Sequence, residues 1–212
     1  AVAQVPDLKS AEDLAYLVGT GYGRNKVPSA DENISEISCH AMGVHVADPN
    51  VKAIIDIGGQ DVKGIAIDAD GTVLNFAMND KCAAGTGRFL EMMAKTMEMS
   101  LDELSKVGLS YQEDITISSM CTVFAESEVV SLIAQNKATD DIVHGLNKAV
   151  AAKTASLVKR VGGEEAYMMT GGVAQNQGLV RTLEERLGTK LVISDKSQLC
   201  GALGAALFAT EM

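Results

Sequence analysis

The sequence predicts an α/β domain built around a mixed β-sheet. Short apolar, β-branched runs follow one another closely between residues 51 and 79 and are separated by tight turns, a pattern typical of an antiparallel meander. After residue 87, strand-like runs alternate with segments of helical periodicity, which favours parallel pairing. With 212 residues, 47% of them hydrophobic and 22% charged, the chain has the composition and length of a globular protein with a sizeable core.

The first half of the chain predicts two helices followed by three strands. Residues 10–19 (SAEDLAYLVG) predict a short helix capped by Ser10, and residues 34–47 (ISEISCHAMGVHVA) space their apolar side chains as one face of a helix. The strands are expected at 51–57, 62–68 and 73–79. The turn Ala69–Thr72 (ADGT) joins the last two of them.

The second half predicts helices alternating with short strands. Residues 87–108 have helical periodicity, and Ser100 with Glu103 forms a capping box that restarts the helix. Further helices are expected at 121–136, 139–163, 173–188 and 198–210. Strands are expected at 114–119, 165–170 and 190–194.

Composition excludes several classes of protein. The net charge of −10 argues against binding to nucleic acid. No apolar run approaches the roughly 20 residues that a membrane span requires, and no signal peptide is visible. Four cysteines without a C-x-x-C pair indicate reduced thiols in a cytoplasmic protein rather than a disulfide scaffold.

Two turns have the form of an apolar strand followed by Gly-Gly, which lets backbone N–H groups approach an anion. The first contains Gly58 and Gly59, and Asp56 before them is placed to hold Mg²⁺ directly or through water. Three polar residues, Gln60, Asp61 and Lys63, are expected to line this turn. In the second, Gly171 and Gly172 open a helix whose N-terminus favours negative charge or a ribose edge. The alternative is that both are ordinary tight turns, since glycine is common in loops generally. Neither turn is a Walker loop.

Cys82 and Cys121 each lie at or just before the N-terminus of an expected helix, where partial positive charge suits an anionic cluster. A [4Fe–4S] cluster needs four thiolates, so two copies of the chain could supply them. Gly85 and Gly87 would let the backbone approach the inorganic sulfides. The alternative is that both cysteines are buried small hydrophobic residues.

The other polar candidates have less specific patterns. Cys39 and Cys200 lie among apolar neighbours and are interpreted as packing residues. His40, His45 and His144 form no metal-ligand pair and are interpreted as structural or surface residues. Glu126 and Glu128 suit the first turns of a helix but could also orient an interface or a nucleotide.

Four stretches in order, IDIGGQDVK, NDKCAAGTGRFLE, SSMCTVFAESEV and MTGGVAQN, resemble the ATP-dependent activators of 2-hydroxyacyl-CoA dehydratases. The wider family includes the ATP-binding subunits of benzoyl-CoA reductase. It belongs to the acetate and sugar kinase, heat-shock-70 and actin superfamily, which has a ribonuclease H-like fold. The resemblance runs from about residue 19 to the C-terminus.

The resemblance implies a homodimer with one [4Fe–4S] cluster held by Cys82 and Cys121 of each chain. It implies ATP or ADP with Mg²⁺, an electron donor such as reduced ferredoxin or flavodoxin, and a 2-hydroxyacyl-CoA dehydratase that receives a low-potential electron. It makes Asp56 and Gln60 the catalytic residues. The phosphate-2 segment maps onto Asp56, Gly58, Gly59, Gln60 and Asp61, and the adenosine segment onto Gly171, Gly172, Gln175 and Asn176.

One departure from the family pattern concerns the start of the chain. Family members begin with a strand that carries an Asp-x-Gly-[ST] phosphate-1 loop, and none precedes Asp56. The sequence is therefore expected to lack the first part of the N-terminal subdomain, either as a fragment or in the working protein, and in the second case ATP hydrolysis is in doubt. Residues 1–50 are interpreted as the remnant of that subdomain, and residues 51–212 as an actin-like ATPase domain with cluster-binding helices.

Three alternatives remain open at this point. The chain could be an ATP-binding subunit of a benzoyl-CoA reductase. It could be a cluster-free sugar or acyl kinase relative. It could also be a non-catalytic interaction module made from half of the fold.

Overall fold

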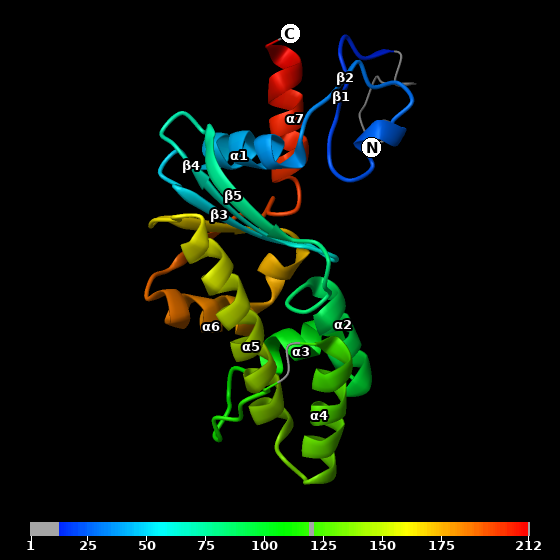
Figure 1. Cartoon of the computed structure of the whole chain (residues 1–212), viewed down its shortest axis with the longest axis vertical. Helices are drawn as coiled ribbons and strands as arrows, with labels where there is room; N and C mark the ends of the chain where they lie inside the picture. Colours follow the sequence, from blue (N-terminus) through cyan, green and yellow to red (C-terminus); the bar gives the residue numbers. More distant parts are fainter. Residues whose placement is uncertain (1–12, 119–120, 212) are drawn as a thin grey trace.

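A mixed five-stranded sheet is the centre of the computed structural model, which describes residues 13–118 and 121–211 (Figure 1). The strand order is β5-β4-β3-β6-β7, in which β3, β4 and β5 are antiparallel neighbours and β3, β6 and β7 are parallel. The strands are β3 (Ala53–Ile57), β4 (Val62–Ile67), β5 (Val73–Asn79), β6 (Tyr167–Thr170) and β7 (Leu191–Ile193). The predicted mixed α/β architecture is therefore confirmed.

Helices cover both faces of this sheet. The first face packs against α1 (Glu36–Ala47) and α7 (Cys200–Thr210), and the second against α5 (Thr139–Arg160), with α6 (Gln177–Leu187) beside α5 (Figure 1). Since strand residues alternate between faces, Ile54 and Met168 point toward α1 and α7. Residues 55, 57 and 169 point the other way, into the larger core.

The two helices on the first face touch along their backbones. A Cβ placed on Gly43 of α1 would overlap the carbonyl of Cys200, and a Cβ on Gly204 of α7 would overlap the carbonyl of Cys39. Cys39 and Cys200 are both buried at this crossing, in agreement with their interpretation as packing residues. The glycines therefore set how closely α1 and α7 approach.

Three helices extend beyond the sheet, at the end of the molecule opposite α1 and α7 (Figure 1). They are α2 (Gly87–Thr96), α3 (Leu101–Val107) and α4 (Thr122–Ala134). The predicted capping box is present at α3, where Ser100 accepts from the backbone N–H of Glu103 and the Glu103 carboxylate accepts from that of Ser100. A 3-10 helix, η4 (Gly172–Gln175), precedes α6, which Asn176 caps by accepting from the Leu179 N–H.

Two expected elements differ from the structure. Residues 13–19 form no α-helix; Val18–Gly19 is the short strand β1, paired with β2 (Glu32–Asn33), and a 3-10 helix, η3 (Arg24–Lys26), lies between them. Ser10 and residues 11–12 lie outside the described residues. Over 114–118 the expected strand is an irregular extended segment, because Ile115 and Ile117 pack into the core beside α5 rather than joining the sheet.

Candidate nucleotide cleft and thiol edge

A cleft of about 310 Å³ opens where the two Gly-Gly turns meet the helices α2 and α3. Six of the residues singled out in the sequence line it: Gly58, Gly59, Gly87, Gly172, Gln175 and Asn176. The remaining lining residues were not predicted: Leu90, Glu91, Leu101, Asp102, Ser105 and Val173. They come mainly from α2 and α3, so their participation depends on tertiary packing.

The second Gly-Gly turn requires glycine at Gly171, although only Gly172 of this pair lines the cleft. This residue has φ of +83°, and a Cβ there would overlap the Ile57 carbonyl and lie 3.0 Å from Asp56 Oδ1. The opposite turn is closed by a hydrogen bond of 3.0 Å from the Gly58 N–H to the Asp61 carbonyl. Both turns therefore bring bare backbone to the cleft, which suits an anionic ligand.

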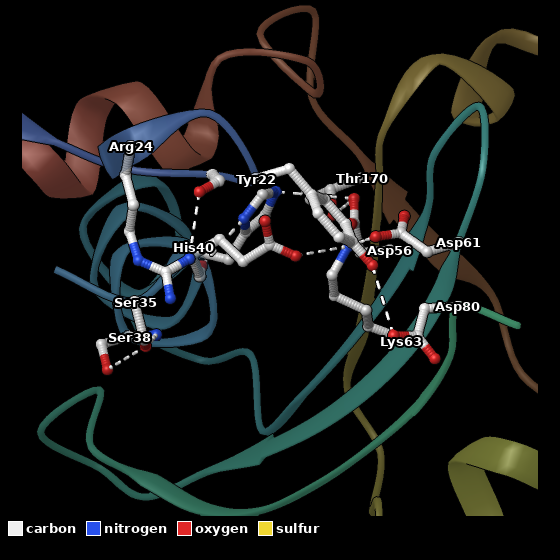
Figure 2. Close-up of polar contacts among 12 residues, drawn as sticks. Tyr22, Arg24, Ser35, Ser38, His40, Asp56, Asp61, Lys63, Asp80 and Thr170 are labelled. Atoms are coloured by element: carbon white, nitrogen blue, oxygen red, sulfur yellow. Dashed lines mark hydrogen bonds and ion pairs between the residues drawn. The ribbon is translucent and has the colours of Figure 1, made fainter. Parts of the chain in front are cut away.

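Beneath the Gly58–Gly59 turn lies a group of charged side chains, which we call the charge cluster: the buried Asp56, Asp61 and Lys63 and the half-buried Glu36 and His40. Figure 2 shows His40, Asp56, Asp61 and Lys63 of this cluster. Sheet register explains its centre, because Asp56 pairs with Lys63 of β4 and with Thr170 of β6, so all three point to the face beneath α1. Thr170 Oγ1 donates to Asp56 Oδ1 at 2.9 Å, and Lys63 Nζ donates to Asp56 Oδ2 at 3.1 Å.

Lys63 connects three carboxylates of the charge cluster. Its Nζ lies 2.6 Å from Asp61 Oδ2, 3.1 Å from Asp56 Oδ2 and 3.0 Å from Glu36 Oε1. Burial alone would lower the pKa of Lys63, but these carboxylates outweigh it and raise the pKa above its ordinary value. Lys63 is thus turned into the protein and does not line the cleft.

His40 belongs to the charge cluster although its sequence pattern indicated only a structural or surface residue. Its Nδ1 lies 3.1 Å from the Glu36 carbonyl, and its Nε2 lies 3.5 Å from Asp56 Oδ1 (Figure 2). Burial alone would lower the pKa of His40, but the Asp56 carboxylate raises it. His40 shares a helix face with Ile37, Ala41 and Val44, and a polar residue on an apolar face was the signal available in the sequence.

Asp56, which the sequence assigned to Mg²⁺ binding and catalysis, is held by its neighbours within the charge cluster. Asp56 is 4% exposed, and both its oxygens already have protein partners. Burial alone would raise the pKa of Asp56, but His40 and Lys63 hold it well below its ordinary range. Both Asp56 oxygens are therefore already engaged by the protein, which favours contact with a metal through water. Gln60 is exposed and is not among the residues that line the cleft.

Cys82 and Cys121, each of which is followed by the start of a helix, are both exposed. We call the segment 82–88 together with Cys121 and helix α4 the thiol edge. The Cys82 carbonyl accepts from Asn79 Nδ2 at 3.0 Å, and Lys153 of α5 donates to the Ala84 carbonyl at 2.7 Å. Cys121 is the N-cap of α4, and its carbonyl accepts from the Ala125 N–H at 2.9 Å. Gly85 is buried next to Lys153 rather than lining the cleft.

Backbone hydrogen bonds join the cleft directly to the thiol edge. The Gly87 N–H donates to the Gly58 carbonyl at 2.8 Å, and the Arg88 N–H donates to the Gly59 carbonyl at 2.9 Å. A Cβ on Gly87 would lie 3.2 Å from both the Gly58 carbonyl oxygen and Gly59 Cα. The first turn of α2, which follows Cys82, is therefore fixed to the turn that faces the cleft.

Glu126 and Glu128 do not act as helix starters, because neither lies in the first turn of α4. Glu126 accepts from Thr96 Oγ1 at 3.1 Å and so joins α4 to α2. Glu128 accepts from Ser118, which precedes the helix. Both carboxylates therefore point toward the protein.

The outer side of α4 is apolar. Val123 and Phe124, next to Cys121, are 62% and 67% exposed, and Val130 and Ile133 are exposed further along. The two acidic residues of this helix, Glu126 and Glu128, are half-buried and hydrogen-bonded to neighbouring segments, and the helix has no basic residue. Exposed apolar patches of this kind are uncommon on monomeric proteins.

Within residues 13–118 and 121–211, no three His, Cys, Asp or Glu side chains are grouped so as to hold a metal ion. Among these same residues no helix is long and apolar enough to cross a membrane.

Comparison with known proteins assigns this arrangement to a family. The model of the BadF/BadG/BcrA/BcrD ATPase family matches residues 8–209. The chain belongs to this family. A 2-hydroxyisocaproyl-CoA dehydratase activator from Clostridioides difficile is 51% identical to this ATPase over 200 residues, which are 94% of this chain and 75% of the relative.

Solved structures agree with the family assignment. The (R)-2-hydroxyglutaryl-CoA dehydratase component A of Acidaminococcus fermentans is 50% identical, with a TM-score of 0.91 over 94% of this ATPase and 77% of that chain. The activator of the 2-hydroxyisocaproyl-CoA dehydratase from Clostridium difficile with bound ADPNP is 50% identical, with a TM-score of 0.90 over 95% and 75% of the two chains. A more distant likeness to MreB 5 of Spiroplasma citri, at 14% identity and a TM-score of 0.51, indicates an actin-like fold.

Proposed function

We propose that this ATPase activates a 2-hydroxyacyl-CoA dehydratase by coupling ATP hydrolysis to transfer of a low-potential electron. The observation that carries the proposal is the direct backbone connection between the cleft and the thiol edge, through Gly58 and Gly59 to Gly87 and Arg88. A movement of the nucleotide-facing turn displaces the helix start behind Cys82. Relatives that are about half identical to this chain bear the names of dehydratase activators, which supports the same role.

The nucleotide occupies the cleft between the two Gly-Gly turns. The cleft-lining backbone at Gly59 and Gly172 faces the phosphates, and the side of the cleft made by α2 and α3 contains the apolar Leu90 and Leu101 for the base. Mg²⁺ arrives with the phosphates and meets Asp56 through water, because both oxygens of that carboxylate already have protein partners. The charge cluster then acts from below by fixing the strand ends and the Gly58–Gly59 turn.

A [4Fe–4S] cluster is held between two copies of the chain by Cys82 and Cys121 of each. The fit rests on two exposed thiols, on the helix start that follows each one and on the absence of carboxylates in the first turns of α2 and α4. When bound, the cluster supplies one electron at low potential. The protein contributes thiolate ligands, helix ends that favour negative charge and an apolar surround from Val123 and Phe124.

The partners follow from this arrangement. A second copy of the chain completes the ligand set. A 2-hydroxyacyl-CoA dehydratase accepts the electron, and reduced ferredoxin or flavodoxin replaces it. The exposed apolar side of α4 supports burial of the thiol edge against other protein surfaces.

The test is anaerobic purification followed by iron and sulfide determination and a dehydratase assay. We expect about two irons per chain in a dimer, and ATP-dependent activation of a purified 2-hydroxyacyl-CoA dehydratase in the presence of a reductant. Cys82→Ser and Cys121→Ser should each lose the iron and the activation, whereas Cys39→Ser serves as a matched control at a buried position. An iron-free, folded monomer that still activates the dehydratase would refute the proposal.

A further inference from the structure

The side-chain amide of Asn147 is buried beside the wall of the cleft without a hydrogen bond. Asn147 belongs to α5 and is 0% exposed, and among the residues that the structure describes neither its Oδ1 nor its Nδ2 has a partner. Buried polar groups are nearly always hydrogen-bonded, because leaving one unpaired destabilises the fold. The surroundings of this amide indicate which group could pair with it.

Two helices that border the cleft meet at this amide. A Cβ on Gly178, in the first turn of α6, would lie 2.7 Å from Asn147 Nδ2. A Cβ on Gly108, at the end of α3, would lie 3.2 Å from the same atom. Because α3 and the residues just before α6 both line the cleft, Asn147 lies where two sides of the cleft come together.

The carbonyl of Ser105 is placed to become the partner of the amide. The same Cβ on Gly178 would lie 3.1 Å from the Ser105 carbonyl oxygen, so this acceptor and Asn147 Nδ2 flank one point of α6. Ser105 lies in the last turn of α3, where carbonyls have no acceptor role within the helix and take donors from outside it. Ser105 also lines the cleft, so a ligand that moves this wall moves the carbonyl.

We propose that Asn147 is a positioning residue for the nucleotide, and that it fixes α3 against the ligand by donating from Nδ2 to the Ser105 carbonyl. The inference rests on the proposed function, in which a nucleotide occupies the cleft. In the arrangement that the structure shows the amide is unpaired, and a small shift of α3 toward α5 and α6 pairs it. A nucleotide that draws α3 inward therefore gains affinity from the hydrogen bond that forms. Asn147 itself touches neither phosphate nor base.

The experiment measures the affinity of the full chain for ADP by calorimetric titration. Asn147→Ala removes the amide and should bind ADP about 3-fold to 10-fold more weakly than the natural chain. Thr154→Val is the matched control, because Thr154 is 1% exposed on the same helix and its hydroxyl also lacks a partner within the described part of the chain. It lies about 10 Å further along α5, and its loss should leave ADP affinity unchanged.

Stability separates positioning from packing. In urea without nucleotide, Asn147→Ala should unfold at about the same denaturant concentration as the natural chain, because removal of an unpaired amide offsets the lost packing. With saturating ADP, this variant should unfold at a lower concentration than the natural chain. Hydrogen exchange at residues 101–107 should be slowed by ADP in the natural chain and less so in Asn147→Ala. A variant that is less stable without nucleotide but binds ADP normally would show a purely structural role and overturn the proposal.

The two proposals fail in distinguishable ways. If the natural chain does not bind ADP, the nucleotide assignment of the cleft is wrong and the role of Asn147 falls with it. If the natural chain binds ADP and Asn147→Ala binds it equally well, the positioning role alone is wrong. The same holds if Thr154→Val weakens ADP binding as much as Asn147→Ala does.

Discussion

The charge cluster and the thiol edge lie on either side of the Gly58–Gly59 turn and have opposite characters. In the charge cluster, Lys63 and Asp56 are almost fully buried and each has several protein partners. At the thiol edge, Cys82 and Cys121 are exposed and Phe124 faces solvent. The chain completes the first region by itself, whereas the second has the surface of a region that partners complete.

From this contrast we infer different roles for the charge cluster and the thiol edge on either side of the Gly58–Gly59 turn. In the proposed function, the preorganised charge cluster holds the strand ends still while the turn responds to the nucleotide. The hydrogen bonds from the first turn of α2 to that turn would pass the response on to the thiol edge. Substitutions should therefore affect stability on one side and assembly on the other.

The largest effect is expected from Lys63→Met. The variant leaves Asp56, Asp61 and Glu36 without their shared cation, and breaking a buried ion pair in this way costs about 3–5 kcal/mol. Lys52→Met is the matched control, because Lys52 forms an exposed pair with Glu164 worth less than about 1 kcal/mol. Urea unfolding measures both free energies; equal losses in the two variants would remove the distinction between the regions.

A smaller effect is expected from acid. The folded-state pKa of Asp56 is depressed, so its contribution to stability is present above the unfolded-state pKa of about 4 and is lost as the pH falls below it. The natural chain should therefore lose unfolding free energy more steeply below pH 4 than Lys63→Met does, since that variant has lost one cause of the depression. Parallel slopes in urea titrations at pH 5 and pH 3 would contradict this.

Gly87→Ala tests the connection between the two regions. The added Cβ would lie 3.2 Å from the Gly58 carbonyl oxygen and force the turn and helix apart, at a cost of about 1–3 kcal/mol. We expect ADP to slow hydrogen exchange at residues 83–88 of the natural chain and not of this variant. Arg88→Ala retains the backbone bond and loses only an exposed pair with Glu91, so it should respond to ADP as the natural chain does.

The smallest effect on stability is expected from Phe124→Ser. The side chain is 67% exposed, so the unfolding free energy of the metal-free chain should change by no more than about 0.5 kcal/mol. Sedimentation of the anaerobic holoprotein should nevertheless show a weaker dimer, because an apolar contact is lost from the thiol edge. A loss of stability as large as that of Lys63→Met would mean that the two regions do not differ.

Local signals in the sequence were sufficient for most of the fold. Ser100 and Glu103 marked the start of α3, and tight turns marked the meander of β3, β4 and β5. The strand expected at 114–119 was wrong, since alternating isoleucines pack equally well against a helix as within a sheet. Gly58, Gly59 and Gly172, which the sequence singled out, line the cleft, and they could be recognised because glycine requirements are local.

The side-chain contacts within and around the site were harder to predict from the sequence. Lys63 was expected to line the turn, but strand register places it opposite Asp56 and turns it into the protein. His40 reaches Asp56 only because α1 crosses this face of the sheet. Glu128 contacts a residue ten positions earlier, a pairing that helical periodicity does not encode. In each case the partner is set by tertiary packing.

The close crossing of α1 and α7 has a consequence for how the protein is made. Gly43 and Gly204 lie far apart in the sequence, and their helices together shield Ile54, Ile65 and Met168. During synthesis, α1 and the strands emerge well before residues 200–210, so this apolar surface stays half covered until α7 has been made. This side of the molecule therefore closes late, and until then its apolar surface is open to non-native contacts.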